Sequence, residues 1–246
     1  MITDFDYFKV KIITDLLGYT WWFLAWYLSV KYYFSRNIPK TPLRNLEEKI
    51  FYYLWVFGWA MFFAILISTF DNFVNNYGWW DKVYLTKSIA WAICWWVIYS
   101  EIFKKIYNHN FNRWVLFVPS LVVWTIIWRI GAFIIWLRDN THWIPTNLPW
   151  WYDYWDHILR HPAQIYEIII LTIFWIIFIF WLKYKKEYFI KKWFFLFTLI
   201  YFSYRFLVGF IMPYSNFWLW LNTIQVVSIW MIIYSIYKLK FKVYGK

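Results

Sequence analysis

Cysteine and charge are both scarce in this sequence of 246 residues. The single cysteine, Cys94, excludes an intramolecular disulfide and a cysteine-based metal cluster. Charged residues make up only 15% of the chain, and 13 acidic residues stand against 25 basic ones. The charges occur in short clusters between long uncharged stretches, which is typical of a chain whose main solvent is lipid.

Apolar residues are what the chain has in abundance. The sequence is 63% hydrophobic and 29% aromatic, whereas a soluble domain is roughly 45–50% apolar. The basic residues lie mostly in short loops that bound apolar segments, so they indicate membrane topology and contact with anionic lipid rather than nucleic-acid binding. We therefore expect an all-α, polytopic membrane protein that forms one integral membrane domain over residues 1–246.

Seven apolar segments are long enough to cross a hydrocarbon core of roughly 30 Å at a rise of 1.5 Å per residue. Lys and Arg are much more frequent in the loops after the first, third and fifth segments and in the C-terminal tail than in the other loops. The positive-inside rule then places the N-terminus outside and the C-terminus in the cytoplasm. The predicted spans are residues 12–33, 50–70, 83–100, 114–137, 162–182, 193–212 and 217–237.

Three charged residues lie inside the predicted spans and away from the span ends: Arg129, Glu167 and Arg205. An ion near the bilayer centre costs about 2.5–3.5 kcal/mol on insertion scales, so each marks a candidate functional site. All three lie roughly 8–12 Å below the outer boundary, at the depth of Gln225, and can meet only inside the bundle. One interpretation is an ion-pair network that fixes helix packing. The other is that an anionic ligand, such as a phospholipid phosphate, neutralises the positive charge that remains when two arginines face one glutamate.

Further polar residues surround these charges in the sequence. Arg160, Gln164 and Glu167 follow an i, i+4, i+7 spacing that would stack them on one helical face, and Tyr201 lies one turn before Arg205. This spacing predicts a polar pocket between helices. His161 follows Arg160 at the mouth of the fifth span, where an imidazole suits a solvated helix start as well as a site.

Four segments resemble one known family. Arg160-His161-Pro162-Ala163-Gln164-Ile165-Tyr166-Glu167 resembles the R-H-P-S-Q-L-Y-E motif of the prolipoprotein diacylglyceryl transferases, seven-span enzymes of the bacterial inner membrane. Residues 129–134 (R-I-G-A-F-I) are similar to R-x-G-N-F-I, 145–150 (P-T-N-L-P-W) to P-T-D-L-P-W, and 201–208 (Y-F-S-Y-R-F-L-V) to Y-G-x-F-R-F-L-V. Order and spacing agree, and the resemblance covers about residues 114–237.

The resemblance implies transfer of a diacylglyceryl group from phosphatidylglycerol to the cysteine thiol of a prolipoprotein signal peptide. A thioether forms, glycerol phosphate is released, and no metal, nucleotide or other cofactor is required. The reaction needs a cationic clamp for the departing phosphate and a base or field that favours the thiolate. The implied catalytic residues are Arg129, Arg205 and His161, and the implied substrate-binding residues are Arg160, Gln164, Tyr166, Glu167 and Tyr201.

The sequence also departs from the family pattern. Residues 132–137 (A-F-I-I-W-L) replace N-F-I-N-G-E, Gly209 replaces a glutamate, and the H-G-G-L motif falls at residues 90–93 (A-W-A-I) with no histidine. Two functions therefore stay open: an active, divergent transferase, which we favour, and a member without catalysis that binds anionic phospholipid or lipoprotein precursors. An unrelated transporter is disfavoured, because the embedded charges are confined to the outer half of the membrane.

Overall fold

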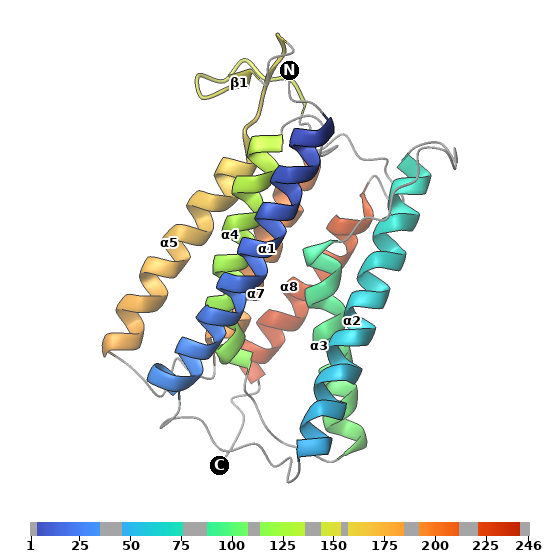
Figure 1. Cartoon of the computed structure of the whole chain (residues 1–246), viewed down its shortest axis with the longest axis vertical. Coiled ribbons are helices and arrows are strands. Elements are labelled where there is room, and N and C mark those ends of the chain that lie inside the picture. Colours follow the sequence, from blue (N-terminus) through green and yellow to red (C-terminus); the bar gives the residue numbers. More distant parts are fainter. Residues whose placement is uncertain are drawn as a thin grey trace. The chain divides into compact units, whose positions relative to one another are not determined.

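The computed structural model describes residues 4–34, 46–75, 88–107, 114–135, 144–153, 157–184, 192–211 and 221–241. These residues are almost entirely helical and form seven α-helices (Figure 1). Four stretches of helix are long and apolar enough to cross a membrane, namely Glu47–Asp71, Trp114–Ile134, Ala163–Lys183 and Trp193–Ile211. The all-α membrane fold is thus confirmed, while the number of seven spans and the orientation of the termini stay predictions.

Each helix overlaps one predicted span. The helices are α1 (Asp4–Leu28), α2 (Leu46–Asn75), α3 (Ile89–Ile106), α4 (Val118–Ile135), α5 (Ala163–Tyr184), α7 (Trp193–Val208) and α8 (Thr223–Phe241). Short turns extend three of them: η1 (Ser29–Phe34) follows α1, η3 (Trp114–Phe117) precedes α4, and η5 (Gly209–Ile211) follows α7. The predicted positions 83–87, 136–137, 212 and 217–220 lie outside the described residues.

Helix α3 extends beyond the predicted third span. Helix α3 continues past residue 100 to Ile106, although the sequence becomes charged there. The carboxylate of Glu101 pairs with Lys104 one turn later, so the charges are satisfied within the folded chain and do not end the helix.

The chain divides into two compact units. Unit 1 consists of Met1–Ile38 and Arg113–Pro213, and unit 2 of Pro39–Asn112 and Tyr214–Lys246. In unit 1, α4 packs against α1 and α5, and α5 packs against α7. In unit 2, α3 packs against both α2 and α8.

Helices α1 and α4 of unit 1 approach closely at a glycine. A Cβ atom at Gly131 would lie 2.6 Å from the Cγ2 atom of Thr14, which is closer than two carbon atoms can pack. The missing side chain therefore permits this contact, as small residues do between membrane helices. Gly131 lies two residues after Arg129 in the same helix.

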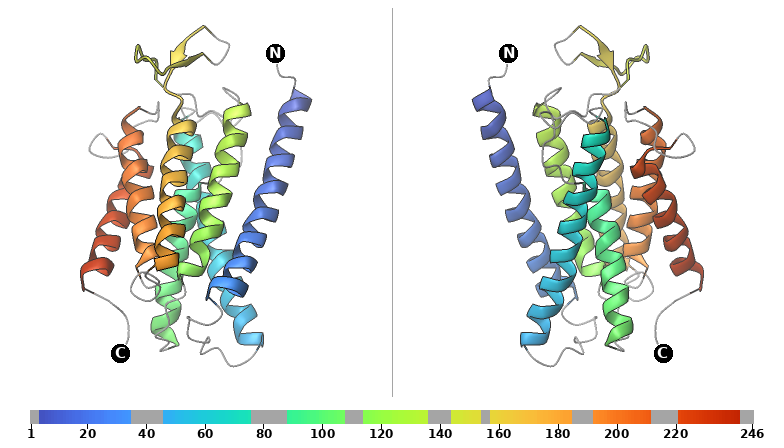
Figure 2. Two further views of the ribbon diagram at one scale, coloured as in Figure 1. Left: turned by 90° about the vertical axis from the view of Figure 1, so that its left-hand side faces the viewer. Right: turned by 90° about the vertical axis from the view of Figure 1, so that its right-hand side faces the viewer.

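A small hairpin lies beyond the N-terminal end of α5 (Figure 2). Strands β1 (Tyr152–Asp153) and β2 (Leu159–Arg160) pair antiparallel, and β2 leads directly into α5. The backbone N–H of Ile144 donates a hydrogen bond to the carbonyl of Ile211 at the end of η5. The segment before β1 is thus joined to η5 through Ile144 and to β2 through the hydrogen bond from the Thr146 N–H to the Leu159 carbonyl.

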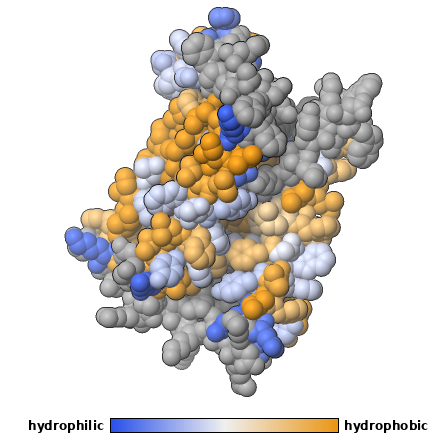
Figure 3. All heavy atoms as spheres, viewed as in Figure 1, coloured by the Kyte–Doolittle hydropathy of each residue, from blue (hydrophilic) through white to orange (hydrophobic). Residues whose placement is uncertain are grey.

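Aromatic rings join α2 and α3 in unit 2. Phe63 stacks on Trp95 with ring centroids 4.5 Å apart, and Phe57 stacks on Trp96. Elsewhere apolar side chains cover the helix flanks (Figure 3). On α5 the exposed large apolar residues are Ile169, Ile173, Ile176, Ile177, Ile179 and Phe180, a surface suited to lipid rather than water.

Candidate functional site

Arg129, Glu167 and Arg205 meet inside unit 1. The Oε2 atom of Glu167 lies 2.8 Å from Nε of Arg129, and its Oε1 atom lies 3.6 Å from Nη2 of Arg205. The three side chains come from α4, α5 and α7 and are 11%, 3% and 7% exposed, respectively. One carboxylate therefore bridges two guanidinium groups from different helices.

Tyr201 orients the second arginine. The Nε–H group of Arg205 donates a hydrogen bond to the Tyr201 hydroxyl at 3.1 Å, and the guanidinium lies 5.5 Å from the centre of the tyrosine ring. Tyr201 is one turn earlier on α7 and is fully buried. Tyr201 thus holds the Nε edge of the guanidinium, while the Nη2 atom faces Glu167.

The site carries an excess of positive charge. Guanidinium groups stay protonated in proteins, so two arginines and one carboxylate leave a single positive charge among the three side chains. A buried charge is costly unless it is paired. Within the described residues, Oε1 of Glu167 also accepts no hydrogen bond. The arrangement can therefore take an anionic group, together with a hydrogen-bond donor for the carboxylate.

Two of the residues predicted around this site are buried as well. Gln164 and Arg160 are 2% and 8% exposed. Gln164 shares α5 with Glu167, but Arg160 lies in β2, where its backbone pairs with Tyr152. The expected helical stacking of Arg160 on Gln164 is thus wrong, because α5 begins only at Ala163.

His161 and Tyr166 form a separate pair at the start of α5. The Nδ1 atom of His161 lies 3.2 Å from the Tyr166 hydroxyl, within hydrogen-bonding distance. The indole of Trp150, two residues before β1, also contacts Tyr166. Tyr166 therefore connects the imidazole to the segment that leads into the hairpin, one residue before Glu167.

Tyr204 was not singled out from the sequence. Its hydroxyl donates a hydrogen bond of 2.7 Å to the carbonyl of Ala163 and so links α7 to the first turn of α5. Its ring packs in an apolar cluster with Ala163 and Val208. The family motif Y-G-x-F-R-F-L-V has phenylalanine at this position. The additional hydroxyl of Tyr204, next to Arg205, was the sequence feature that could have pointed to this hydrogen bond.

Gln225 has a local role. Its side-chain oxygen accepts a hydrogen bond from the backbone N–H of Asn222, while the Asn222 side chain accepts one from the backbone N–H of Gln225. This reciprocal pair caps the start of α8. The amide thus satisfies a helix terminus in unit 2.

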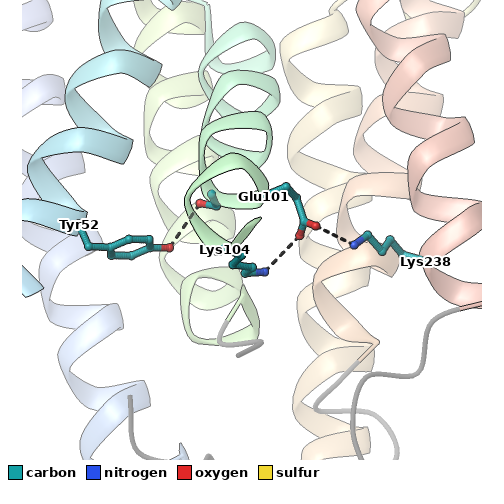
Figure 4. A network of polar contacts seen from close by, with 5 residues as sticks. Tyr52, Glu101, Lys104 and Lys238 are labelled. Atoms are coloured by element: carbon teal, nitrogen blue, oxygen red, sulfur yellow. Dashed lines mark hydrogen bonds and ion pairs between the residues drawn. The ribbon is translucent and has the colours of Figure 1, made fainter. Parts of the chain in front are cut away.

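A second polar cluster, in unit 2, also escaped the sequence analysis. Glu101 of α3 accepts hydrogen bonds from Lys104 at 3.1 Å and from Lys238 of α8 at 3.0 Å (Figure 4). Each carboxylate oxygen takes one ammonium group. Glu101 and Lys238 are 137 positions apart in the sequence, so no local pattern indicates the pair.

Residues 83–240 match the family model described as prolipoprotein diacylglyceryl transferase. The match extends over more than half of the chain and includes Arg129, Glu167 and Arg205. No curated protein and no solved structure matches the chain significantly. The family resemblance of the four motif segments is thereby confirmed, and this all-helical membrane chain belongs to the prolipoprotein diacylglyceryl transferase family.

Proposed function

We propose that this protein transfers a diacylglyceryl group from phosphatidylglycerol to the cysteine thiol of a prolipoprotein signal peptide. It does so in the bacterial inner membrane, as one domain with seven spans, an outer N-terminus and a cytoplasmic C-terminus. The family match supports a transferase of lipoprotein biosynthesis. The observation that carries the proposal is the convergence of Arg129 and Arg205 on Glu167, which leaves a buried positive charge.

The reaction breaks one bond and forms another. The thiol sulfur attacks the glycerol carbon that bears the phosphate, a carbon–sulfur bond forms, and the carbon–oxygen bond to phosphate breaks. Glycerol phosphate leaves with the electron pair. Because negative charge develops on the departing phosphate, Arg129 and Arg205 stabilise it by charge-assisted hydrogen bonds.

The thiol must also lose its proton, since the thiolate is the nucleophile. His161 is our candidate acceptor, with Tyr166 holding its Nδ1 atom. Glu167 is the alternative acceptor, although its bridging position suits it better to holding the two arginines. Arg160, Gln164 and Tyr201 complete the proposed substrate-binding set, with Tyr201 orienting Arg205.

A second candidate function is binding without turnover. Its support is the absence of an imidazole from residues 90–93 and the presence of Gly209 in place of a glutamate. A binder retains phosphatidylglycerol through the same arginines but forms no thioether.

Complementation tests the proposal. In cells depleted of their own transferase, we expect the wild-type chain to restore lipoprotein modification, and Arg205→Ala to lower transfer by about 10²–10³-fold, as for loss of an oxyanion-stabilising donor. Arg129→Ala should behave similarly, whereas Lys105→Gln, at an exposed position in unit 2, should not. Unchanged transfer by an inserted Arg205→Ala chain would remove the clamp from the mechanism. Arginine-dependent retention of phosphatidylglycerol without modification would establish the binder.

A further inference from the structure

Residues 144–151 (I-P-T-N-L-P-W-W), which lead into strand β1, contain no charged residue. We call them the apolar segment. Their large apolar side chains, those of Ile144, Leu148, Trp150 and Trp151, are all exposed, and Trp150 is 57% exposed. An exposed apolar surface of this kind marks a site of contact with a membrane or another protein.

The first residue of the apolar segment lies at the end of a membrane span. The backbone N–H of Ile144 donates a hydrogen bond to the carbonyl of Ile211, and Ile211 ends the apolar stretch Trp193–Ile211. The apolar segment therefore begins at the level where that stretch leaves the hydrocarbon.

The other end of the apolar segment lies at the start of a second span. The indole of Trp150 contacts Tyr166, which lies three residues after the apolar stretch Ala163–Lys183 begins. Helical side chains tilt toward the N-terminus, so the Tyr166 ring reaches toward the start of α5. The hydrogen bond from Tyr204 to Ala163 joins the start of α5 to the last turns of α7. Both ends of the apolar segment thus lie at one membrane boundary.

The apolar segment continues the lipid-facing surface of α5. Ile169, Ile173 and Ile177 follow Tyr166 at spacings of three, seven and eleven residues, which places all four on one helical face. The three isoleucines are exposed, and Trp150 lies against the tyrosine at the end of this row. The surface offered to lipid therefore extends from the helix onto the apolar segment.

The backbone of the apolar segment needs little hydration. Two of its eight residues are prolines, which have no N–H group. The residues whose N–H groups donate hydrogen bonds within the protein are Ile144, Thr146, Leu148 and Trp151. Unpaired N–H groups are costly beside hydrocarbon, so this pairing suits a segment at the edge of the membrane.

The hairpin that follows is polar where it is most exposed. The side chain of His157 is 97% exposed, and its backbone N–H donates a hydrogen bond of 3.0 Å to the Asp153 carboxylate. This hairpin lies beyond the N-terminal end of α5 (Figure 2). The change from apolar to polar side chains therefore occurs between the apolar segment and the hairpin.

We propose that the apolar segment lies in the headgroup layer of the membrane leaflet on the hairpin side, with Trp150 and Trp151 as its anchors. Indole rings favour this layer, because an apolar ring and an N–H group meet lipid and water at once. Since the segment is uncharged, its contact with the membrane requires no anionic lipid. The proposal does not depend on the transfer reaction proposed above.

Electron paramagnetic resonance of spin-labelled, full-length protein in phosphatidylcholine vesicles measures this depth. In a Cys94→Ala background, single nitroxides are attached after Leu148→Cys or Trp151→Cys. We expect both labels at roughly 15–20 Å from the bilayer centre, the range between the hydrocarbon boundary and the outer edge of the headgroups. Oxygen should therefore reach them better than a water-soluble nickel chelate does.

Two reference positions bracket the expected depth. Ile173→Cys places the label ten residues into the α5 span, about 15 Å from its start, where nickel access should be lowest. His157→Cys places it on the polar hairpin, where nickel access should be highest. Nickel access at positions 148 and 151 equal to that at 157 would overturn the proposal, and either position suffices if the other variant does not insert.

Lipid composition and a peptide separate the possible partners. Adding phosphatidylglycerol to the vesicles should leave the depth at positions 148 and 151 unchanged, whereas insertion only in anionic vesicles would overturn the apolar basis of the contact. A synthetic prolipoprotein signal peptide should also leave both depths unchanged. Protection from nickel that appears only after the peptide is added would assign the surface to the peptide and overturn the membrane contact.

Discussion

Glu167 in unit 1 and Glu101 in unit 2 each lie between two cations, but the two clusters use different chemistry. Glu167 is 3% exposed and bridges two guanidinium groups, whereas Glu101 is 30% exposed and bridges two ammonium groups. Arginine stays charged at any depth and presents a planar fork, while lysine is a strongly hydrated point charge. The comparison teaches that a carboxylate between two cations is enclosed in unit 1 and partly open to its surroundings in unit 2.

Neutralising each carboxylate tests this difference most directly. Glu167→Gln leaves two buried guanidinium groups without their counter-charge and should cost about 3–5 kcal/mol of unfolding free energy. Glu101→Gln should cost less, about 1–3 kcal/mol, because the carboxylate is itself partly solvated although the ammonium groups of Lys104 and Lys238 are buried. Denaturant titration of both variants in detergent checks the order. Equal losses would show that the two environments do not differ as described.

Packing around Arg129 gives the next effect in size. Gly131→Ala forces a methyl group against Thr14 and should destabilise the protein by about 1–3 kcal/mol, as overpacking does, with transfer activity falling as Arg129 shifts. The matched control is Gly58→Ala in α2 of unit 2, where a Cβ meets nothing within 4 Å. That change should be neutral or stabilising by up to about 1 kcal/mol. A thermal melt in which Gly131→Ala is as stable as Gly58→Ala would contradict the close approach of α1 and α4.

The smallest effect should come from Tyr204. Tyr204→Phe removes the hydrogen bond to Ala163 and should lower stability by about 1 kcal/mol, with a modest loss of transfer. Tyr237→Phe, at an exposed position of α8, serves as the control. If both tyrosine variants behaved alike in melting and transfer assays, the hydrogen bond between α7 and α5 would contribute neither to stability nor to transfer.

The sequence predicts those features that depend on local patterns. Long apolar runs locate the helices, and depth within a span indicates that Arg129, Glu167 and Arg205 share a layer. Features that depend on tertiary pairing are less accessible. The contact between Glu101 and Lys238 exists only in the folded unit, and Arg160 was placed on a helical face because its pairing in β2 has no local signature. Gln225 was placed at the depth of the three charges, but its side chain caps the start of its own helix.

The bridging position of Glu167 has a consequence for how the arginine site tolerates change. Since both guanidinium groups bind the same carboxylate, their separation is fixed by the width of one carboxyl group rather than by the length of any connecting loop. Lengthening or shortening a loop between α4, α5 and α7 would not change the separation of the two guanidinium groups as long as the three helices remain packed. Variation in the loops of such a protein is therefore compatible with a constant fit to one small anion.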